Sequence, residues 1–513
     1  MKAKNLLLFA VLIAALNLLS VGQAPAQTFT TLHSFTPGIV YYAFDDVPLG
    51  LANSDGINPN SLILSGNTLY ATAGTGGGQA SGALFSMNTD GTGLTNLHSF
   101  EAPDLHGFYT PETNPDGINP NSLILSGNIL YGTAEKGGQG FDSGALFAVN
   151  TDGTGFTNLH NFTVNCCFVG VSNWDGTHPE GRMLLSGNTL YGTASAGSSS
   201  NNGTLFALNI NSTGFRIVHS FTLARANSSG VATNRDGATP YAGLILSATT
   251  LYGTASACGT GGAGTVFAVN TNGTGFTNLH NFASVHTNFS GVATNSDGAS
   301  PRATLLLSGG TLYGTASSGG AGSGTVFAVN TNGTGFRVVH SFTATHTNSS
   351  GITTNDDGAN PYAELILSGN TLYGTASGGG TEGAGTVFAV NTNGTGFINL
   401  HNFTTPDYTN SDGAGPLGAL VLSGSTLFGT AQRGGSAGNG TVFSLSFAPQ
   451  LTITRSGSNV ILSWSTSVAG FDYTGYSLQS APASTGPFTN LPGATSPYTN
   501  PISASAQFFR LKK

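Results

Sequence analysis

The fold is decided by a stretch that recurs along the chain and is clearest at residues 365–403, which read LILSGNTLYGTASGGGTEGAGTVFAVNTNGTGFINLHNF. An Asn-x-Asp-Gly-x-x-Pro segment precedes it. The whole unit occurs seven times, with successive Asp-Gly pairs separated by 61, 59, 61, 61, 60 and 55 residues. A period of this length predicts an array of one repeated supersecondary unit. We number the copies 1 to 7 by the aspartate of this pair, which is Asp55, Asp116, Asp175, Asp236, Asp297, Asp357 and Asp412.

Each copy is expected to form four strands. In copy 6 these are Leu365–Ser368, Thr371–Ala376, Thr386–Asn391 and Phe397–Phe403, and the first two are joined by a Gly-Asn turn typical of a tight hairpin. The strands carry apolar residues on both faces, as a sheet covered on both sides requires. Four-stranded sheets packed face to face around an axis are the blades of a β-propeller. Kelch and WD40 units are similar but shorter, at about 40 to 50 residues.

The strands with which the array begins and ends predict how it closes. The array begins with a lone fourth strand, Thr28–Phe35, and ends with a third strand, Thr441–Phe447, that has no fourth strand after it. The first strand can therefore complete the last sheet and remove the unpaired edges of an open array. We predict an all-β chain in which residues 27–448 form a seven-bladed β-propeller closed by its N-terminal strand.

The repeated motifs Leu-Tyr-Gly-Thr-Ala, Val-Phe-x-Val-Asn, Gly-x-Gly-Phe and Leu-His-x-Phe resemble the GloVer-type tandem repeat over about residues 28–447. That resemblance implies an exported bacterial protein and supplies no activity. Residues 449–513 lose the repeat and show short alternating strands, which predict a small β-sandwich. Their Leu-Ser-Trp and Gln-Phe-Phe-Arg-Leu pieces resemble a short fibronectin type III or Ig-like module.

Residues 1–26 have the pattern of a signal peptide, with Lys2 and Lys4 before an apolar run and Ala24-Pro-Ala before the expected cleavage point. We therefore expect an exported protein that is secreted, periplasmic or held at the cell surface. No second long apolar segment follows, so no transmembrane segment is expected. Charged residues make up only 7% of the chain, the net charge is −8 and basic runs are lacking, which disfavours nucleic acid as a partner. We expect a monomer.

One histidine and one aspartate recur in every copy and are interpreted as a structural network. The histidine is expected to bond a backbone carbonyl or the aspartate of the following Asp-Gly pair, because buried polar groups need partners. These histidines are His33, His98, His160, His219, His280, His340 and His401. Equivalent residues of different blades cannot converge on one ion, so no metal or other cofactor is expected. Calcium at the Asn-x-Asp-Gly turn is the alternative, although an Asx turn explains the same residues. Cys258 could pair with Cys166 or Cys167, and that pairing is left open.

Differences among the copies indicate a candidate binding site. The fourth and sixth residues before the serine that ends the first strand differ between copies, and the sixth is Pro59 and Pro120 in copies 1 and 2. Period-2 alternation would place the two positions on one side of the strand next to the channel. The candidate ligand-binding residues at this channel mouth are Glu180, Arg182, Tyr241, Arg302, Tyr362 and Glu364.

The function favoured by the sequence is that of an exported binding protein, which presents a loop-rich face to a polar ligand such as a glycan or surface polymer. Variable loops on a rigid scaffold usually carry binding, and no catalytic signature is present. A carbohydrate-active hydrolase or lyase that uses Glu180 and Glu364 is the first alternative, favoured by carboxylates about 5 to 10 Å apart. A purely structural surface repeat is the second, and it would close the mouth with internal ion pairs.

Overall fold

The computed structural model describes residues 27–42, 48–102, 114–138, 143–163, 173–405, 409–449, 451–468, 470–502 and 506–512. Within these ranges the protein is all-β and contains no helix. The chain divides into two compact units, one of residues Phe29–Ser444 and one that includes Leu445–Lys513. The predicted signal peptide lies outside the described residues.

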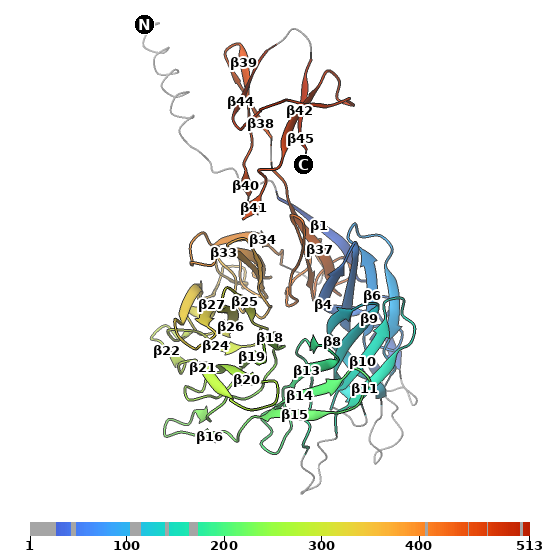
Figure 1. Cartoon of the computed structure of the whole chain (residues 1–513), viewed down its shortest axis with the longest axis vertical. Coiled ribbons are helices and arrows are strands. Elements are labelled where there is room, and N and C mark those ends of the chain that lie inside the picture. Colours follow the sequence, from blue (N-terminus) through green and yellow to red (C-terminus); the bar gives the residue numbers. More distant parts are fainter. Residues whose placement is uncertain are drawn as a thin grey trace. The chain divides into compact units, whose positions relative to one another are not determined.

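The repeat array folds into many small antiparallel sheets, one for each copy (Figure 1). In copies 1 to 4 the strands are β4 (Ile57–Ser65), β5 (Thr68–Thr75), β6 (Ala83–Asn88) and β7 (Thr95–Ser99); β8 (Asn114–Ser126), β9 (Ile129–Gly138), β10 (Ala145–Asn150) and β11 (Thr157–Asn161); β12 (Leu184–Ser186), β13 (Thr189–Ala194), β14 (Thr204–Asn209) and β15 (Arg216–Ser220); β18 (Ile245–Ser247), β19 (Thr250–Ala255), β20 (Thr265–Asn270) and β21 (Thr277–Asn281). Each sheet keeps its strands in chain order.

Copies 5 to 7 follow the same plan. Their strands are β24 (Ala299–Pro301), β25 (Leu306–Ser308), β26 (Thr311–Ser318), β27 (Gly322–Asn330) and β28 (Arg337–Thr343); β31 (Ile366–Ser368), β32 (Thr371–Ala376), β33 (Thr386–Asn391) and β34 (Ile398–Asn402); β35 (Val421–Ser423), β36 (Thr426–Ala431) and β37 (Thr441–Phe447). The copy 5 sheet has five strands because β24 and β25 both pair with β26. The inner two strands of copy 6 match the predicted ranges, whereas its first and last strands are shorter than predicted.

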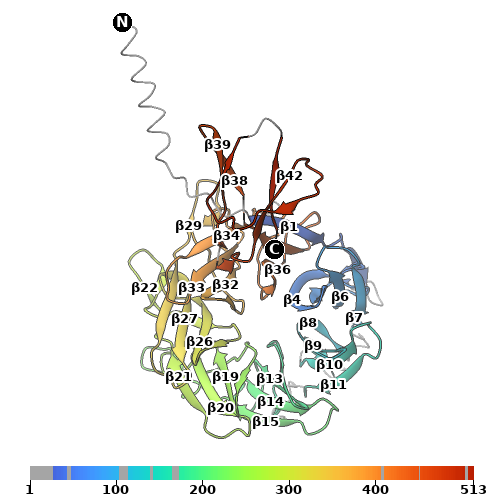
Figure 2. The ribbon, with the colours of Figure 1, turned by 45° about the horizontal axis from the view of Figure 1, so that its top comes forward.

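The sheet of copy 7 is completed by β1 (Gln27–Ser34), the first described strand of the chain, in the order β1-β37-β36-β35. The N–H of Phe35 continues this contact and donates to the carbonyl oxygen of Gly440 at 3.1 Å. Figure 2 shows the sheets following one another around a common centre, with β1 beside the last of them. The beginning and end of the array therefore hydrogen-bond to each other, as predicted from the lone fourth strand at its start and the missing fourth strand at its end.

Apolar side chains fill the space between neighbouring sheets. One such core joins Tyr252 and Val266 of copy 4 to Leu312 and Phe327 of copy 5, all of them buried. The same kind of core joins copy 7 to copy 1, where Val442 and Phe428 pack with Leu69 and Phe85. Burial on both faces explains why the strands lack the apolar–polar alternation of a half-exposed sheet.

In most copies a threonine of the second strand connects its sheet to the next one, and in copy 2 the Ser122 hydroxyl, which contacts Thr133, donates to the carbonyl oxygen of Gly181 instead. The hydroxyl of Thr193 donates to the carbonyl oxygen of Ala242 at 2.9 Å, and that of Thr254 to Ala303 at 3.4 Å. The last such contact returns to the start of the array, because the Thr430 hydroxyl donates to the carbonyl oxygen of Asn60 at 3.0 Å.

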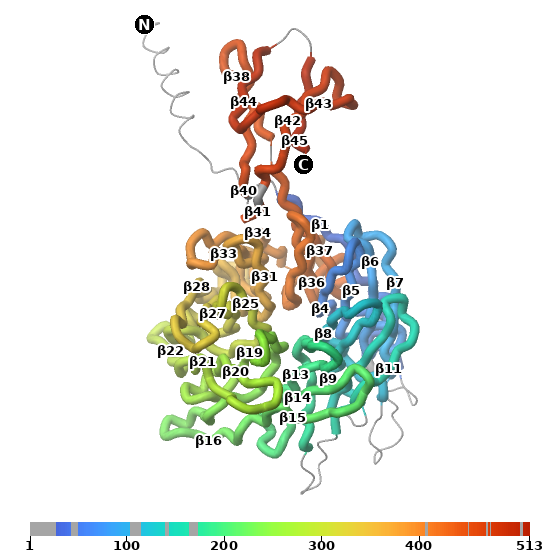
Figure 3. Tube along the Cα trace, viewed as in Figure 1, coloured from blue at the N-terminus to red at the C-terminus, as the bar shows by residue number. Residues whose placement is uncertain are grey.

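Short hairpins that the sequence did not predict lie between the fourth strand of one copy and the first strand of the next. They are β2 (Ile39–Tyr42) with β3 (Pro48–Ala52), β16 (Arg225–Ala226) with β17 (Ala232–Thr233), β22 (His286–Thr287) with β23 (Ala293–Thr294), and β29 (His346–Thr347) with β30 (Thr353–Thr354). Two of them can be followed in the tube of Figure 3 by the labels β16 and β22.

The C-terminal unit forms two three-stranded sheets and one small ladder. The strands are β38 (Thr452–Ser456), β39 (Asn459–Ser463) and β44 (Tyr498–Pro501); β43 (Thr489–Asn490), β42 (Ser477–Ala481) and β45 (Phe508–Lys512); β40 (Ser467–Val468) and β41 (Phe471–Asp472). Leu462, Trp464 and Leu478 form a core shared by the two larger sheets. Its resemblance to a fibronectin type III or Ig-like module stays a prediction.

Candidate functional site

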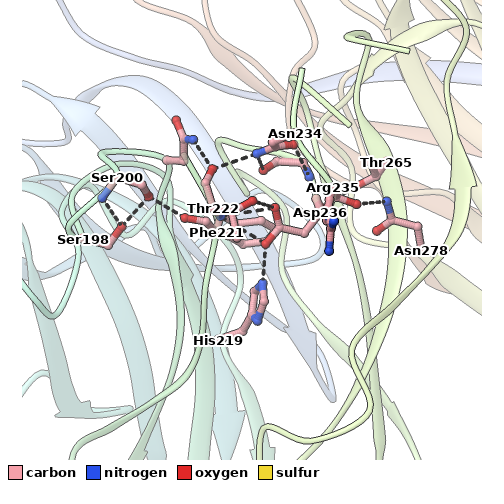
Figure 4. Close-up of polar contacts among 12 residues, drawn as sticks. Ser198, Ser200, His219, Phe221, Thr222, Asn234, Arg235, Asp236, Thr265 and Asn278 are labelled. Carbon is pink, nitrogen blue, oxygen red and sulfur yellow. Dashed lines mark hydrogen bonds and ion pairs between the residues drawn. The ribbon is translucent and has the colours of Figure 1, made fainter. Parts of the chain in front are cut away.

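The repeated histidine and aspartate meet in every copy. Nε2 of each histidine lies 2.8–3.2 Å from Oδ2 of the aspartate that follows it in the chain. Figure 4 shows His219 and Asp236, whose carboxylate also accepts the backbone N–H of Thr222 at 3.1 Å and the hydroxyl of the same residue. The side chain of Asn234 completes the turn by accepting the N–H of Gly237 at 2.8 Å.

The surroundings of these aspartates favour the ionised carboxylate. Burial acts to raise the pKa of Asp236, but hydrogen bonds from His219 and Thr222 outweigh it and hold that pKa below its ordinary value. The pKa values of Asp55, Asp357 and Asp412 are lowered by the same balance. The donors around each carboxylate are N–H and O–H groups of the protein, as in an Asx turn. Calcium at this turn stays a prediction.

Six of the seven histidine rings also stack on a phenylalanine of the neighbouring sheet, whereas His33 has Leu94 at the equivalent position of that sheet. His219 stacks on Phe276 with ring centroids 4.0 Å apart, and His401 stacks on Phe29 at 3.8 Å. The second pair joins the end of the array to its beginning. Within the described ranges, no group of three or more His, Cys, Asp or Glu side chains could hold a metal ion. These rings are therefore placed for packing between sheets.

Residues of all seven copies line one cavity of about 670 Å³. The six candidate ligand-binding residues, Glu180, Arg182, Tyr241, Arg302, Tyr362 and Glu364, are all part of its lining. The lining also contains the residue that follows the repeated proline in every copy, namely Asn60, Asn121, Glu180, Tyr241, Arg302, Tyr362 and Leu417. The positions at which the copies differ therefore come together in space.

The expectation that Pro59 and Pro120 share this side of the strand is wrong, because Asn60 and Asn121 line the cavity instead. Copies 1 and 2 have one residue fewer between the proline and the serine, and their strands β4 and β8 have irregular register there. In copy 3 the strand β12 begins only at Leu184, so Glu180 and Arg182 precede it. Alternation of side chains holds only within a strand, and these residues lie before it. Consistent with this, Gly181 lines the cavity together with its two neighbours.

A left-handed residue before each proline directs the chain toward the cavity. Asn58, Ser300 and Asn360 have φ of 58°, 55° and 56°, and other copies show the same feature. A positive φ is uncommon outside glycine and is best tolerated by asparagine. The repeated x-Pro step is thus a fixed backbone kink that presents the following residue to the cavity.

An ion pair crosses between two distant copies within the lining. Nη2 of Arg182, in copy 3, lies 2.9 Å from Oε1 of Glu364, in copy 6. Burial raises the pKa of Glu364, while the guanidinium opposes the shift. Glu364 is therefore engaged by a cation and is not a free carboxylate.

Arg302 occupies a different setting beside two aromatic rings. Its Cζ lies 4.5 Å from the ring centroid of Tyr241 and 5.7 Å from that of Tyr362. These three residues follow the prolines of copies 4, 5 and 6. Both tyrosines therefore make cation–π contacts with the Arg302 guanidinium.

Glu135, at the end of β9, is a lining residue that the sequence interpretation missed. Burial and the charge of Glu135 raise the pKa of Glu180 to about 7, against the Ser195 hydroxyl and the charges of Arg302 and Lys136. The Ser195 hydroxyl donates to Glu180 at 3.2 Å, and the amide of Asn119 donates to Glu135. Burial and the charge of Glu180 also raise the pKa of the Tyr241 phenol, which the charge of Arg302 opposes.

A signal for Glu135 exists in the sequence at the residue after Leu-Tyr-x-Thr-Ala. That position is Gly74, Glu135, Ser195, Ser256, Ser317, Ser377 and, in the Leu-Phe-Gly-Thr-Ala copy, Gln432. The comparison of copies that identified the first-strand positions would have found it at the end of the second strand. Gly74 and Gln432 line the cavity with Glu135.

Cys258 is not among the residues that line this cavity. Cys258 is buried and forms no disulfide among the described residues, whereas Cys166 and Cys167 lie outside them. Burial and the nearby charge of Asp236 raise the pKa of the Cys258 thiol. Over the described ranges, no helix has the length and apolar character needed to span a membrane.

Solved structures with similar backbones are distant in sequence. Oligogalacturonate lyase from Vibrio parahaemolyticus has a TM-score of 0.42 and 10% identity, covering 82% of this chain and 98% of the lyase. Trypanosoma rangeli sialidase has a TM-score of 0.39 and 9% identity, covering 83% of this chain and 60% of the sialidase. A nidogen/laminin complex chain has a TM-score of 0.33 and 13% identity, covering 62% of this chain and 92% of its own.

No curated protein matches the chain. A family description does: the Gloeobacter/Verrucomicrobia repeat matches residues 31–234, 229–359 and 348–478, which together span the array and reach into the C-terminal unit. With its seven tandem copies and the matches that run through them, this chain belongs to the Gloeobacter/Verrucomicrobia repeat family.

Proposed function

We propose that the protein is an exported, monomeric binding protein whose repeats close into a seven-bladed propeller and whose cavity takes a polar ligand, a glycan or other cell-surface component. The signal-like residues 1–26 support export. Closure is supported by the pairing of β1 with β37 and by the hydrogen bond from Thr430 to Asn60. The C-terminal unit would act as a spacer or attachment module.

The observation that carries the proposal is the convergence of variable positions on one cavity. The motifs that build the sheets are nearly uniform from copy to copy, whereas the lining residues include carboxylates, guanidinium groups, tyrosines and amides. A volume of about 670 Å³ is in the range of ligand pockets in proteins. Asn60, Asn121 and Gln432 offer both donors and acceptors, and the tyrosine rings offer flat apolar surface.

The test is binding of the purified protein to glycans, peptides and surface polymers, with Tyr362→Ala as the cavity variant. Tyr42→Ala is the matched control, because Tyr42 is exposed on β2 and does not line the cavity. The expected result is a ligand that binds the wild type and the control equally and the cavity variant about ten-fold more weakly. The proposal fails if no such ligand is found, or if Tyr362→Ala binds as well as the wild type.

A carbohydrate-active hydrolase or lyase is the second candidate, and one observation favours it. The Glu180 carboxyl, whose pKa is raised to about 7, is suited to donate or accept a proton at neutral pH. Its interacting carboxylate is Glu135, not the predicted Glu364, which is paired with Arg182. Release of new sugar ends or unsaturated products, abolished in Glu180→Gln, would establish this activity in place of simple binding.

A further inference from the structure

Arg302 is a cation of the cavity that forms no ion pair among the described residues, although its charge acts on Glu180. In the described part of the chain, no carboxylate lies within ion-pair distance of its guanidinium, which also donates no hydrogen bond. Arg182 is bonded to Glu364, whereas Arg216 and Arg337 donate to backbone carbonyl oxygens of the next copy at 2.8 and 2.9 Å. Arg302 is thus held by ring faces alone, and its N–H groups remain available.

The chemistry of this arrangement selects the ligand group. A guanidinium offers N–H donors in a planar fork that matches the two oxygens of a carboxylate. The cation–π contacts with Tyr241 at 4.5 Å and Tyr362 at 5.7 Å limit the freedom of that fork before a ligand arrives. A planar anion bound edge-on to Arg302 would lie close to the two phenol rings.

The rest of the lining suits a sugar. Copies 1, 2 and 7 contribute side-chain amides, which can bond several hydroxyl groups. They are Asn58, Asn60, Asn119, Asn121 and Gln432. This amide-rich part and the Tyr241–Arg302–Tyr362 stack come from different copies and line the same cavity. A ligand that uses both needs many hydroxyls and at least one anionic group.

The charged groups in and near the cavity are equal in number. Glu135, Glu180 and Glu364 carry the acidic groups, and Arg182, Arg302 and the nearby Lys136 carry the basic ones. Burial and the charge of Glu135 raise the pKa of Glu180 to about 7, which lowers the negative charge near Arg302 at neutral pH. This reduces the repulsion that a ligand carboxylate at Arg302 would meet.

We propose that the cavity binds an oligosaccharide containing uronic acid, with a sugar carboxylate on the Arg302 fork beside Tyr241 and Tyr362 and sugar hydroxyls on the amides of copies 1, 2 and 7. The inference rests on the proposed function, since it names the ligand class of the same cavity. It differs from that proposal in requiring the carboxylate.

The experiment is calorimetric titration of the full chain with uronate trimers of mannuronate, guluronate, galacturonate and glucuronate. Each trimer is compared with its methyl ester and with the neutral hexose trimer of the same linkage. At least one uronate trimer is expected to bind, and its ester and neutral counterpart are expected to bind about 10- to 100-fold more weakly, as expected for loss of a charge-assisted hydrogen bond.

Two variants separate the role of Arg302 from loss of folding. Arg302→Ala is expected to weaken uronate binding about 10- to 100-fold, and Arg302→Lys to an intermediate extent because a lysine keeps the charge without the fork. Arg337→Ala is the matched control: Arg337 belongs to the same copy, lies near a tyrosine ring and does not line the cavity. It should bind as the wild type does, with all variants showing the same unfolding midpoint.

The outcomes distinguish this inference from the broader proposal. Equal binding of a uronate and its ester, preference for a sulfated or phosphorylated sugar, or full binding by Arg302→Ala would overturn the inference. If a neutral glycan bound in a manner that depended on Tyr362, the binding function would stand and the uronate assignment would fail. If no glycan, peptide or surface polymer bound, both would fail.

Discussion

A single aspartate in each copy fastens a loop to the sheet that precedes it. Asp357 accepts Nε2 of His340 at 3.1 Å and both the N–H and the hydroxyl of Thr343. These donors lower the pKa of Asp357 despite its burial. The pKa of Asp357 is thus lower in the folded protein than in the unfolded chain. Ionised Asp357 therefore stabilises the fold at any pH above its unfolded-state pKa, and this stabilisation is lost as the pH falls through its folded-state pKa.

The first prediction concerns acid unfolding and the substitution Asp357→Asn. The midpoint of thermal unfolding of the wild type should fall steeply as pH drops through and below 4, because Asp55, Asp236, Asp357 and Asp412 all have lowered pKa values. At neutral pH, Asp357→Asn should cost about 1–3 kcal/mol, since its amide would place a donor against donors.

The matched control for that prediction is Asp152→Asn. Asp152 stands in an exposed turn where copies 4, 5 and 6 carry asparagine at the equivalent position. Circular dichroism should show an unfolding midpoint unchanged by this substitution. If the two variants unfold alike, the buried aspartate does not fasten the loop.

Glu180 supplies the second prediction, which concerns ligand affinity. Burial and the charge of Glu135 raise the pKa of Glu180 to about 7, so its ionisation spans the neutral range. Binding of a uronate trimer should weaken roughly 3- to 10-fold between pH 6 and pH 8, because the ionised Glu180 repels the ligand carboxylate. In Glu180→Gln the affinity should be independent of pH over that interval. A wild-type affinity that rises with pH would contradict the assigned repulsion.

At the scale of elements, the strands with the strongest repeated pattern are the ones that the sequence predicts well. β32 and β33 coincide with the ranges expected from Thr-Leu-Tyr-Gly-Thr-Ala and Thr-Val-Phe-Ala-Val-Asn. The fourth strand is shorter, and its pairing with the third strand has a register shift that pattern alone does not reveal, as where Val387 and Phe388 of β33 pair with His401 and Asn399 of β34. The extra hairpins of copies 3, 4 and 5 were missed because their two-residue strands, joined by Asn-Ser-Ser-Gly or Asn-Phe-Ser-Gly, are too short to show the apolar alternation of a strand.

The site was predicted in part for similar reasons. Comparison of the copies identified six lining residues. Positions that are the same in every copy build the sheets, so positions that differ between copies are candidates for binding. Asn60 and Asn121 were missed because counting from the serine assumed an unbroken strand, whereas the kink before the proline sets the position. Counting forward from the proline would have found both. The Arg182–Glu364 pair depends on a contact across 182 residues, which no local pattern encodes.

The third prediction tests that kink. Ser300 has a φ of 55° and precedes Pro301, where copies 1, 2 and 6 carry asparagine. Ser300→Asn should be neutral or slightly stabilising, whereas Ser300→Val should destabilise the protein by about 1–2 kcal/mol because a β-branched residue disfavours this conformation. Ser300→Val should also weaken ligand binding by displacing Arg302. Equal stability of the two variants, measured by denaturant unfolding, would show that the kink stores no strain.

At the scale of the whole array, stability depends on joining its two ends. β1 pairs with β37, and Phe29 stacks on His401 at 3.8 Å and lies 5.3 Å from the ring of Phe443. Without this strand, β37 would expose an unpaired edge, which favours association between chains. The closing strand therefore protects the array as well as completing its last sheet.

The fourth prediction concerns this closing contact. Phe29→Ala should destabilise the array by about 1–3 kcal/mol and increase the fraction of oligomer seen in size-exclusion chromatography. Thr30→Ala, an exposed neighbour on the same strand, should change neither quantity. An unfolding curve of Phe29→Ala that overlays the wild type would mean that the ends are joined by backbone pairing alone.

The bond between Arg182 and Glu364 has a consequence for how such a gene can change. Nearly identical tandem units are prone to unequal exchange, which adds or removes one unit at a time. In a chain that lost copy 5, the copies of Arg182 and Glu364 would be two repeats apart and not three. The guanidinium and the carboxylate would then no longer face each other in the cavity. The ion pair therefore depends on the number of repeats. A chain with one repeat more or fewer could keep its sheets and still lose this pairing of charges in the cavity.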